Sequence, residues 1–195
     1  WSVHKDAYNS ASIEKSTLKR GQDGQFRYFT SYVSPEDGRW CTTLNKAPSV
    51  GELNPSNTQP LFKATDLGLE GVKDPWILEE DGKYSLFLSV AIDTSTTKDS
   101  SHDTLDIFNT GECISATALA TSTDLDNWDW QGVILKPEGD TAWDKYCRRI
   151  NSVLPLNGKY YAFYDGSEGH HQNYEERTGL AVSTDLKDWT ILSPE

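Results

Sequence analysis

Short strands in which apolar and polar residues alternate are the clearest pattern along the chain. Two of them begin with a turn dipeptide and continue as an aromatic strand, at residues 81–89 (DGKYSLFLS) and 157–165 (NGKYYAFYD). A fainter copy lies at residues 23–31 (DGQFRYFTS). This alternation, together with the lack of a helical period, predicts an all-β protein.

A second motif follows each of the two stronger copies. Residues 118–128 (ALATSTDLDNW) match residues 179–189 (GLAVSTDLKDW), and their starts lie 61 residues apart. A repeat of this length with several short strands is typical of a β-propeller. We therefore expect a four-stranded antiparallel blade at each of the repeats near 23–49, 81–128 and 157–189. A β-sandwich with accidental internal similarity is the alternative.

The chain is short for a complete propeller ring. Propellers usually hold about 4–8 blades, whereas 195 residues supply only three to four repeats of this length. We interpret residues 1–195 as a single, incomplete propeller domain. Its outer sheets are then expected to show unpaired strand edges, or to be covered by further blades or a partner chain.

Composition excludes several classes of protein. Lys and Arg number 18 against 30 Asp and Glu, for a net charge of −12, and the chain holds 7 Trp, 9 Tyr and 6 Phe. Many aromatic residues argue against disorder, and an acidic balance argues against a nucleic-acid partner. No apolar run approaches the roughly 18–20 residues that span a membrane, so no membrane association is expected.

The cysteines and the start of the chain carry less information. Cys41, Cys113 and Cys147 form no CxxC pair, which disfavours a zinc site and allows at most one disulfide within the chain. The chain holds no Met and begins at Trp1, which we interpret as a processing or cropping point. Cysteine usage does not fix the compartment, and we favour a secreted or periplasmic location over the cytoplasm.

The order of strands predicts which segments share one end of the blades. Because neighbouring strands alternate in direction, the start of a first strand and the loop between the second and third strands lie at the same end. Residues 71–76 and 143–152 lead into first strands, and the loops 91–113 and 165–177 join second to third strands. These four segments are expected to rim one mouth.

The first candidate group lies at the start of an inner strand. Asp74 precedes Pro75, which a strand tolerates at its first residue, so the segment could be an ordinary entry turn. Near a propeller axis, Asp74 would instead point into a polar funnel. Lys73 could be its ion-pair partner, and Trp76 could be a platform for a sugar or part of the core.

The second candidate group precedes the next inner strand and consists of Trp143, Asp144, Arg148, Arg149 and Asn151. Two adjacent arginines in a strand point to opposite faces, so only one of them can face the mouth. We expect the other arginine to form a structural ion pair.

The third candidate group is the loop 165–177, which is rich in groups that bind sugars or transfer protons. Adjacent Glu175 and Glu176 cannot both point inward, and a solvated loop without function is the alternative. The candidates are Asp165, Glu168, His170, His171, Glu175, Glu176 and Arg177.

A further loop, residues 93–106, is rich in Ser, Thr and Asp. It could hold a structural calcium ion through Asp99, Asp103 and Asp106, but it lacks the regular spacing of a calcium loop. A flexible insertion is the simpler interpretation. No other cofactor is expected.

These motifs together resemble the five-bladed propeller glycoside hydrolases, the group that contains families 43, 32, 62, 68 and 130. The resemblance is carried by KDP at 73–75, the DGKY and NGKYYAFYDG strands, and the two STDL turns that end in Trp. It covers residues 60–195 well and residues 1–59 weakly. It implies cleavage of a glycosidic bond of a carbohydrate substrate in an axial funnel, by carboxylates that come from separate blades.

The resemblance also implies roles for individual residues. Asp74 matches the aspartate that tunes the general acid or stabilises the transition state. Arg149–Asn151 stands where the general-acid glutamate is expected, so Asp144, Glu175 or Glu176 would have to substitute. The base or nucleophile is expected from the first blade, where Asp6 is the candidate although no proline follows it.

Two functions of different class follow from these residues. A glycosidase would use two carboxyl groups, one protonated as an acid and one ionised as a base or nucleophile. A carbohydrate-binding propeller would keep the funnel without a full catalytic set, and a purely structural propeller is a third option. The carboxylate-rich loop 165–177 favours the enzyme, and the missing glutamate at 149–151 favours the binding module.

Overall fold

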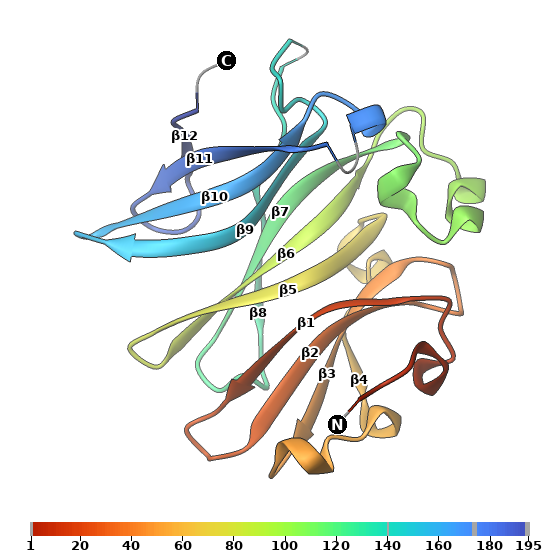
Figure 1. Cartoon of the computed structure of the whole chain (residues 1–195), viewed down its shortest axis with the longest axis vertical. Coiled ribbons are helices and arrows are strands. Elements are labelled where there is room, and N and C mark those ends of the chain that lie inside the picture. The colour runs from red at the N-terminus through yellow and green to blue at the C-terminus, as the bar shows by residue number, and fades with distance from the viewer. Residues whose placement is uncertain (1, 140, 173–174, 194–195) are drawn as a thin grey trace.

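The computed structural model describes residues 2–139, 141–172 and 175–193. Within them the chain forms strands and short 3-10 helices, so the all-β prediction is confirmed. The strands make two sheets, one in the order β1-β2-β3-β4 and one of eight strands. Figure 1 shows the first sheet at the bottom and the second above it.

The first sheet is the four-stranded antiparallel meander that the sequence predicts for a blade. We call it unit 1; it consists of β1 (Ile13–Arg20), β2 (Phe26–Val33), β3 (Trp40–Ala47) and β4 (Gln59–Phe62). Short 3-10 helices precede β1 and connect β3 to β4: η1 (Lys5–Tyr8), η2 (Val50–Glu52) and η3 (Pro55–Asn57).

The eight-stranded sheet consists of two antiparallel halves. Unit 2 comprises β5 (Gly71–Glu80), β6 (Lys83–Asp93), β7 (Cys113–Ser122) and β8 (Asp129–Leu135). Unit 3 comprises β9 (Cys147–Leu156), β10 (Lys159–Ser167), β11 (Arg177–Ser183) and β12 (Thr190–Ile191). A single parallel pair, Ser115 with Cys147, joins the halves. The remaining 3-10 helices are η4 (Thr65–Leu67), η5 (Asp99–Thr104), η6 (Ile107–Asn109) and η7 (His170–Gln172).

The turn dipeptides form the tight hairpins that their sequence predicts. Asp81 and Gly82 have φ values of 48° and 73°, and Asn157 and Gly158 have 53° and 73°. A two-residue hairpin loop needs positive φ at both positions, which Asp, Asn and Gly adopt at low cost. These turns fix the register of β5 with β6 and of β9 with β10.

The repeated STDL turn has a separate role for each of its shared residues. In unit 3, Ser183 Oγ accepts hydrogen bonds from the backbone N–H groups of Asp185 and Leu186. Asp185 Oδ1 accepts two more, and Trp189 Nε1 donates to the Leu186 carbonyl. The turn of unit 2 repeats these contacts with Ser122, Asp124, Leu125 and Trp128.

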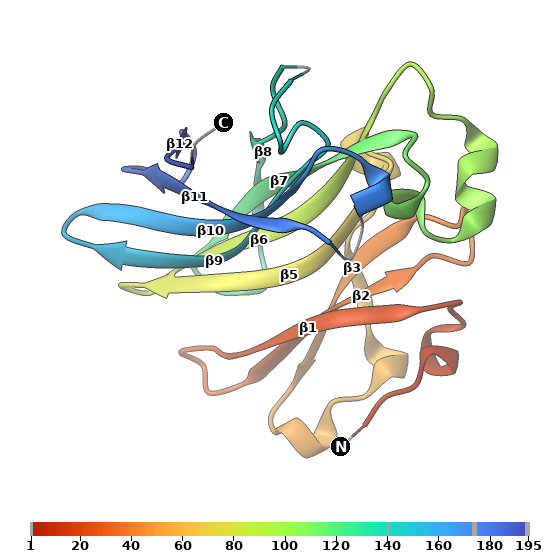
Figure 2. The same cartoon turned by 45° about the horizontal axis from the view of Figure 1, so that its top comes forward.

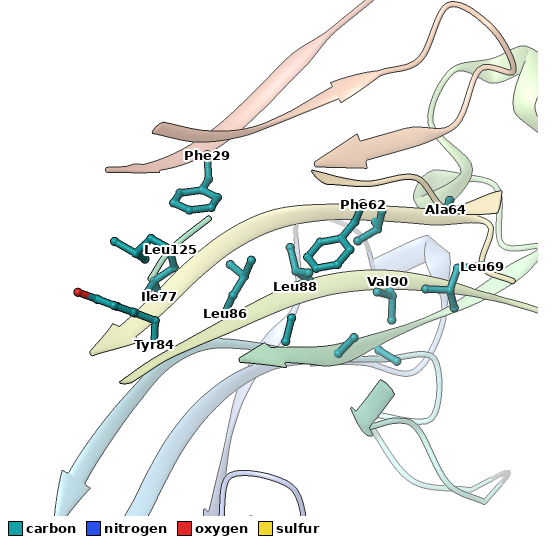
Figure 3. Close-up of a cluster of buried hydrophobic side chains, with 14 residues drawn as sticks. Phe29, Phe62, Ala64, Leu69, Ile77, Tyr84, Leu86, Leu88, Val90 and Leu125 are labelled. Carbon is teal, nitrogen blue, oxygen red and sulfur yellow. The ribbon is translucent and has the colours of Figure 1, made fainter. Parts of the chain in front are cut away.

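This turn holds a leucine against the preceding unit. Leu125 and Leu186 have φ values of 66° and 67°, and both side chains are buried. Leu125 belongs to the core cluster that includes Phe29 of unit 1, and Figure 3 shows these side chains between the sheets. Leu186 belongs to a second cluster, with Phe87 of unit 2. Burial of these apolar side chains therefore stabilises both junctions between the units.

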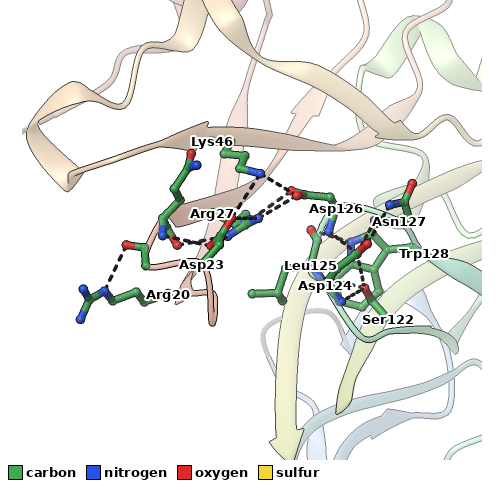
Figure 4. A network of polar contacts seen from close by, with 12 residues as sticks. Arg20, Asp23, Arg27, Lys46, Ser122, Asp124, Leu125, Asp126, Asn127 and Trp128 are labelled. Atoms are coloured by element: carbon green, nitrogen blue, oxygen red, sulfur yellow. Dashed lines mark hydrogen bonds and ion pairs between the residues drawn. The ribbon is translucent and has the colours of Figure 1, made fainter. Parts of the chain in front are cut away.

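A buried arginine adds a polar contact to the first junction. Arg27 Nη2 lies 2.8 Å from Asp23 Oδ2 and 2.7 Å from Asp126 Oδ2, the latter in the STDL turn of unit 2. Lys46 also reaches Asp126. Figure 4 shows the network. The hydrogen bond from Arg27 lowers the pKa of the Asp126 carboxyl, against the smaller opposing effect of burial.

We predict that Arg27→Ala lowers the free energy of unfolding by about 2 kcal/mol, because it removes a buried guanidinium and its charge-assisted hydrogen bonds to two partly exposed carboxylates. Lys46→Ala, at a more exposed position of the same network, should cost less than about 1 kcal/mol. Urea denaturation of the two variants and the wild type measures both effects. Equal costs would contradict the role assigned to Arg27.

The same network predicts a pH dependence. The Asp126 carboxyl has a folded-state pKa below its ordinary value of 3.8, so its contribution to stability is present above pH 3.8 and is lost as the pH falls through the folded-state pKa. We expect wild-type stability to fall more steeply below pH 3.8 than that of Arg27→Ala. Parallel pH profiles of the two proteins would contradict this assignment.

Candidate functional site

A polar pocket lies where the first strands of the three units meet. Its volume is about 340 Å³, which is in the lower range of small-molecule sites. Strands β1, β5 and β9 provide most of its wall, and β6 and β10 provide the rest. The lining residues are Lys15, Ser16, Asp74, Pro75, Trp76, Ser89, Arg149, Ile150, Asn151 and Asp165.

Asp74 is held in this pocket by an irregular stretch of β5. The pairing of β5 with β6 shifts register between Lys73 and Trp76, and Asp74 has a φ of 59°. Its backbone N–H donates to Ser31 Oγ of unit 1 at 2.8 Å. The carboxylate is buried, and its Oδ1 has no hydrogen-bond partner. Strained backbone of this kind is frequent at functional sites.

Lys15 is the cation nearest to Asp74, and the sequence did not indicate it. Its Nζ lies 3.7 Å from Asp74 Oδ2. The pairing of β1 with β2 shifts register between Glu14 and Ser16, and Lys15 has a φ of 33°. No turn or motif marks this position, because the repeat that the sequence reveals begins only at residue 23.

Lys73 does not pair with Asp74, although it precedes it in sequence. Its Nζ lies 2.7 Å from Glu14 Oε2 and 4.7 Å and 4.9 Å from the ring centroids of Trp40 and Phe108. Lys73 is buried, and these contacts connect β5 of unit 2 to unit 1 and to η6. Its role is structural, which corrects the expected Lys73–Asp74 pair.

Arg149 is the arginine that faces the pocket. Its Nη2 lies 3.0 Å from Glu176 Oε1, and its buried Nε has no hydrogen-bond partner. Burial opposes the charged form of the guanidinium, but the surrounding groups outweigh it and raise the pKa of Arg149. These groups are Cys147, Asp74, Glu176 and Asp165.

Asp165 is the second carboxylate that lines the pocket. It lies in β10, directly opposite Arg149 in β9. Its Oδ1 accepts a hydrogen bond from Asn151 Nδ2 at 2.9 Å. Two carboxylates from different units therefore line the pocket, Asp74 from unit 2 and Asp165 from unit 3.

Asp144 and Arg148 form a structural ion pair outside this pocket, which corrects Asp144 as a substitute acid. Arg148 Nε and Nη2 donate to the Asp144 carboxylate at 2.9 Å and 2.8 Å, and the Tyr164 hydroxyl donates to it at 2.7 Å. Both charged side chains are buried. Trp143 stacks on the Tyr164 ring and completes this cluster, so it does not line the pocket either.

Other candidates from the sequence also lie outside the pocket. Asp6 is exposed in η1, pairs with His4 and Lys5, and lines a different hollow beside Tyr8. Glu175 is exposed, whereas its neighbour Glu176 is partly buried against Arg149. His170 and Arg177 are exposed and do not line the pocket either. Residues 173 and 174 of the loop 165–177 lie outside the described residues.

Neither a metal site nor a membrane-spanning helix is present among the described residues. No group of three His, Cys, Asp or Glu side chains there could hold a metal ion, and Asp99 and Asp103 are exposed. No described helix is long and apolar enough to cross a membrane.

Comparison with solved structures identifies the fold. No family model matches the chain, and no curated protein matches it. Solved structures do match. A thermostable family-43 glycoside hydrolase aligns with 94% of this chain and 55% of its own, at 17% identity and a TM-score of 0.67. The chain has the fold of the propeller glycoside hydrolases.

Two further matches support the same conclusion. A family 117 glycoside hydrolase from the marine bacterium Zobellia galactanivorans aligns with 99% of this chain and 58% of its own, at 15% identity and a TM-score of 0.66. Sucrose-6-phosphate hydrolase from Lactobacillus gasseri aligns with 94% and 35%, at 14% identity and a TM-score of 0.61. The chain spans between 35% and 58% of the length of these three structures.

The assignment of Asp144 to the structure rather than to the pocket can be tested. Asp144→Ala should lower the free energy of unfolding by about 3–5 kcal/mol, because it leaves the Arg148 guanidinium buried without a partner. Asp6→Ala, at an exposed position, should leave the urea midpoint unchanged. Undiminished stability of Asp144→Ala would contradict the structural assignment.

Proposed function

We propose that this chain forms three blades of a propeller glycoside hydrolase, with Asp74 and Asp165 as the two carboxyl groups at the scissile glycosidic bond. One observation carries the proposal. Asp74 has a buried oxygen without a hydrogen-bond partner in a pocket that Asp165 also lines. A buried acceptor left unpaired costs free energy, and a bound ligand is one way to recover it.

Asp74 lies near positively charged side chains from two other units. Lys15 lies near its carboxylate, and Arg149 faces the same pocket. Asp74 would then act as the base or nucleophile, or stabilise the positive charge that develops on the sugar ring in the transition state.

Asp165 is the better candidate for the proton donor. Asn151 donates to Oδ1 alone, which leaves Oδ2 to carry a proton toward the leaving-group oxygen. Glu176 is less suited, because its carboxylate is paired with Arg149 and it does not line the pocket. The sequence placed Asp165 among the candidates of the loop 165–177 but gave it no catalytic role of its own.

The rest of the wall suits a carbohydrate. Trp76, Pro75 and Ile150 offer apolar surface for the C–H face of a sugar ring, while Ser16, Ser89 and Asn151 offer hydrogen bonds to hydroxyl groups. Such a site combines an apolar wall with a few polar groups that set orientation.

A carbohydrate-binding module is the second candidate function. It is favoured by Arg149, which stands where the resemblance places the acid and is already paired with Glu176. The binding module would use the same pocket without turnover.

Turnover of a panel of aryl glycosides and oligosaccharides by the wild-type chain distinguishes the two functions. In the enzyme, Asp74→Asn and Asp165→Asn should each lower kcat by at least about 10²-fold, because each removes a group that acts in the transition state. Sugar binding by calorimetry should persist in both variants. Asp6→Asn is the matched control and should keep full activity.

Full activity of Asp74→Asn would contradict its proposed role. Sugar binding by the wild type without turnover of any substrate, weakened by Asp74→Asn, would favour the binding module.

A further inference from the structure

Strands β1 and β5 each carry a bulge at the pocket. The register of each strand on its partner shifts at one point, which leaves Lys15 in β1 and Asp74 in β5 out of the strand pairing. Their φ values are 33° and 59°, a conformation that residues other than glycine seldom adopt. A bulge bends its strand and redirects a side chain. The two bulges therefore decide where the charged groups of Lys15 and Asp74 lie in the pocket.

The residues that precede the two bulged residues form an ion pair with each other. Glu14 comes directly before Lys15, and Lys73 comes directly before Asp74. Lys73 Nζ lies 2.7 Å from Glu14 Oε2. One residue further along both strands, Lys15 Nζ lies 3.7 Å from Asp74 Oδ2. Figure 2 shows β1 and β5 side by side, and these two pairs connect them with the positions of acid and base exchanged.

The two ion pairs differ in their access to water. The Lys73 side chain is 8% exposed and packs on the rings of Trp40 and Phe108, which gives its charge a fixed position. The Lys15 side chain is 66% exposed, and its contact with Asp74 is longer. An exposed ion pair contributes little by itself, because water screens it and the long side chain loses entropy. The buried pair is therefore the rigid one of the two.

Strand β2 holds the backbone of both bulges. Thr30 Oγ1 lies 3.4 Å from the Glu14 carbonyl oxygen and 3.3 Å from that of Lys15, so its hydroxyl donates to the bulge of β1. The adjacent Ser31 Oγ accepts a hydrogen bond from the Asp74 backbone N–H. Each bulge is thus anchored to β2, and the pair of Lys73 with Glu14 adds a direct link from one bulge to the other.

We propose that Glu14 and Lys73 are positioning residues of the pocket: their ion pair joins the two bulges and holds Lys15 against Asp74. The inference rests on the proposed function, in which Asp74 is one of the two carboxyl groups at the glycosidic bond. Neither Glu14 nor Lys73 lines the pocket, so their effect on turnover passes through Lys15. A contact that stabilises the junction of units 1 and 2 thereby also sets the geometry of the site.

Turnover of an aryl glycoside by Glu14→Gln, alone and combined with Lys15→Met, tests this role. Glu14→Gln should lower kcat/KM roughly 3- to 30-fold, because residues that act through one another are coupled. The loss should fall on kcat, since the residues that line the sugar site are unchanged. In the Lys15→Met background the same substitution should have no effect. Lys73→Met, which keeps the buried stem, should behave as Glu14→Gln does.

An equal loss in both backgrounds would overturn the proposal, because a role in folding alone does not depend on Lys15. Lys19→Gln is the matched control. Lys19 Nζ lies 3.6 Å from Glu79 Oε2, a further ion pair between β1 and β5 that lies away from both bulges. Lys19→Gln should keep the kcat/KM of the wild type. A loss equal to that of Glu14→Gln would show that any ion pair between these strands suffices, which would also overturn the proposal.

Carbodiimide cross-linking locates Lys15 without any sugar. The reagent activates the Asp74 carboxyl, the Lys15 amine displaces the activating group as a urea, and an amide bond joins the two side chains. Mass spectrometry should detect the joined peptides in the wild type and in Lys19→Gln, and Glu14→Gln should lose most of this product.

No cross-link in the wild type, or an undiminished yield in Glu14→Gln, would overturn the positioning role. The two proposals fail separately. If the wild type turns over no glycoside but its cross-link depends on Glu14, the proposed activity is refuted while Glu14 and Lys73 keep their positioning role.

Discussion

Packing of one unit against the next through a leucine and a phenylalanine is the contact on which the rest of this structure depends. A single four-stranded sheet has nothing against which to bury its apolar face. Sheets that pack on one another share a continuous hydrophobic core. Leu125 and Phe29 share the core cluster of the first junction, and Leu186 and Phe87 share that of the second, so buried apolar side chains hold neighbouring units at a set spacing. That spacing brings the starts of β1, β5 and β9 together around one pocket.

The polar contacts of the junctions divide into those that support packing and those that serve the pocket. Arg27 with Asp126, and Lys73 with Glu14, tie unit 1 to unit 2 from positions outside the pocket. Asp144 with Arg148 does the same within unit 3. Each of these buried cations has carboxylate partners, whereas Asp74 keeps one buried oxygen unpaired. Asp74 is thus distinguished from these structural ion pairs by an acceptor that no described group satisfies.

The strands and turns could be predicted from the sequence because the residues that determine them lie close together along the chain. Gly82 and Gly158 in the hairpin turns, and Ser183 and Asp185 in the STDL turn, each satisfy a backbone requirement within a few residues. The pocket was harder to predict, because register shifts in β1 and β5 decide where its side chains point. The sequence showed that Arg148 and Arg149 must diverge, but only Asp144 on one side and Glu176 on the other reveal which of them faces the pocket.

The hydrogen bond from the Asp74 backbone N–H to Ser31 Oγ makes the geometry of the pocket depend on a contact between two units. Ser31 belongs to unit 1 and Asp74 to unit 2, so a residue of the neighbouring unit helps to position Asp74. Lys15 and Arg149 come from the two outer units in the same way. No single unit contains all the residues that line the pocket, so a duplicated unit would not carry a second copy of the pocket. A substitution at a junction between units would thus change the geometry of the pocket without altering any residue that lines it.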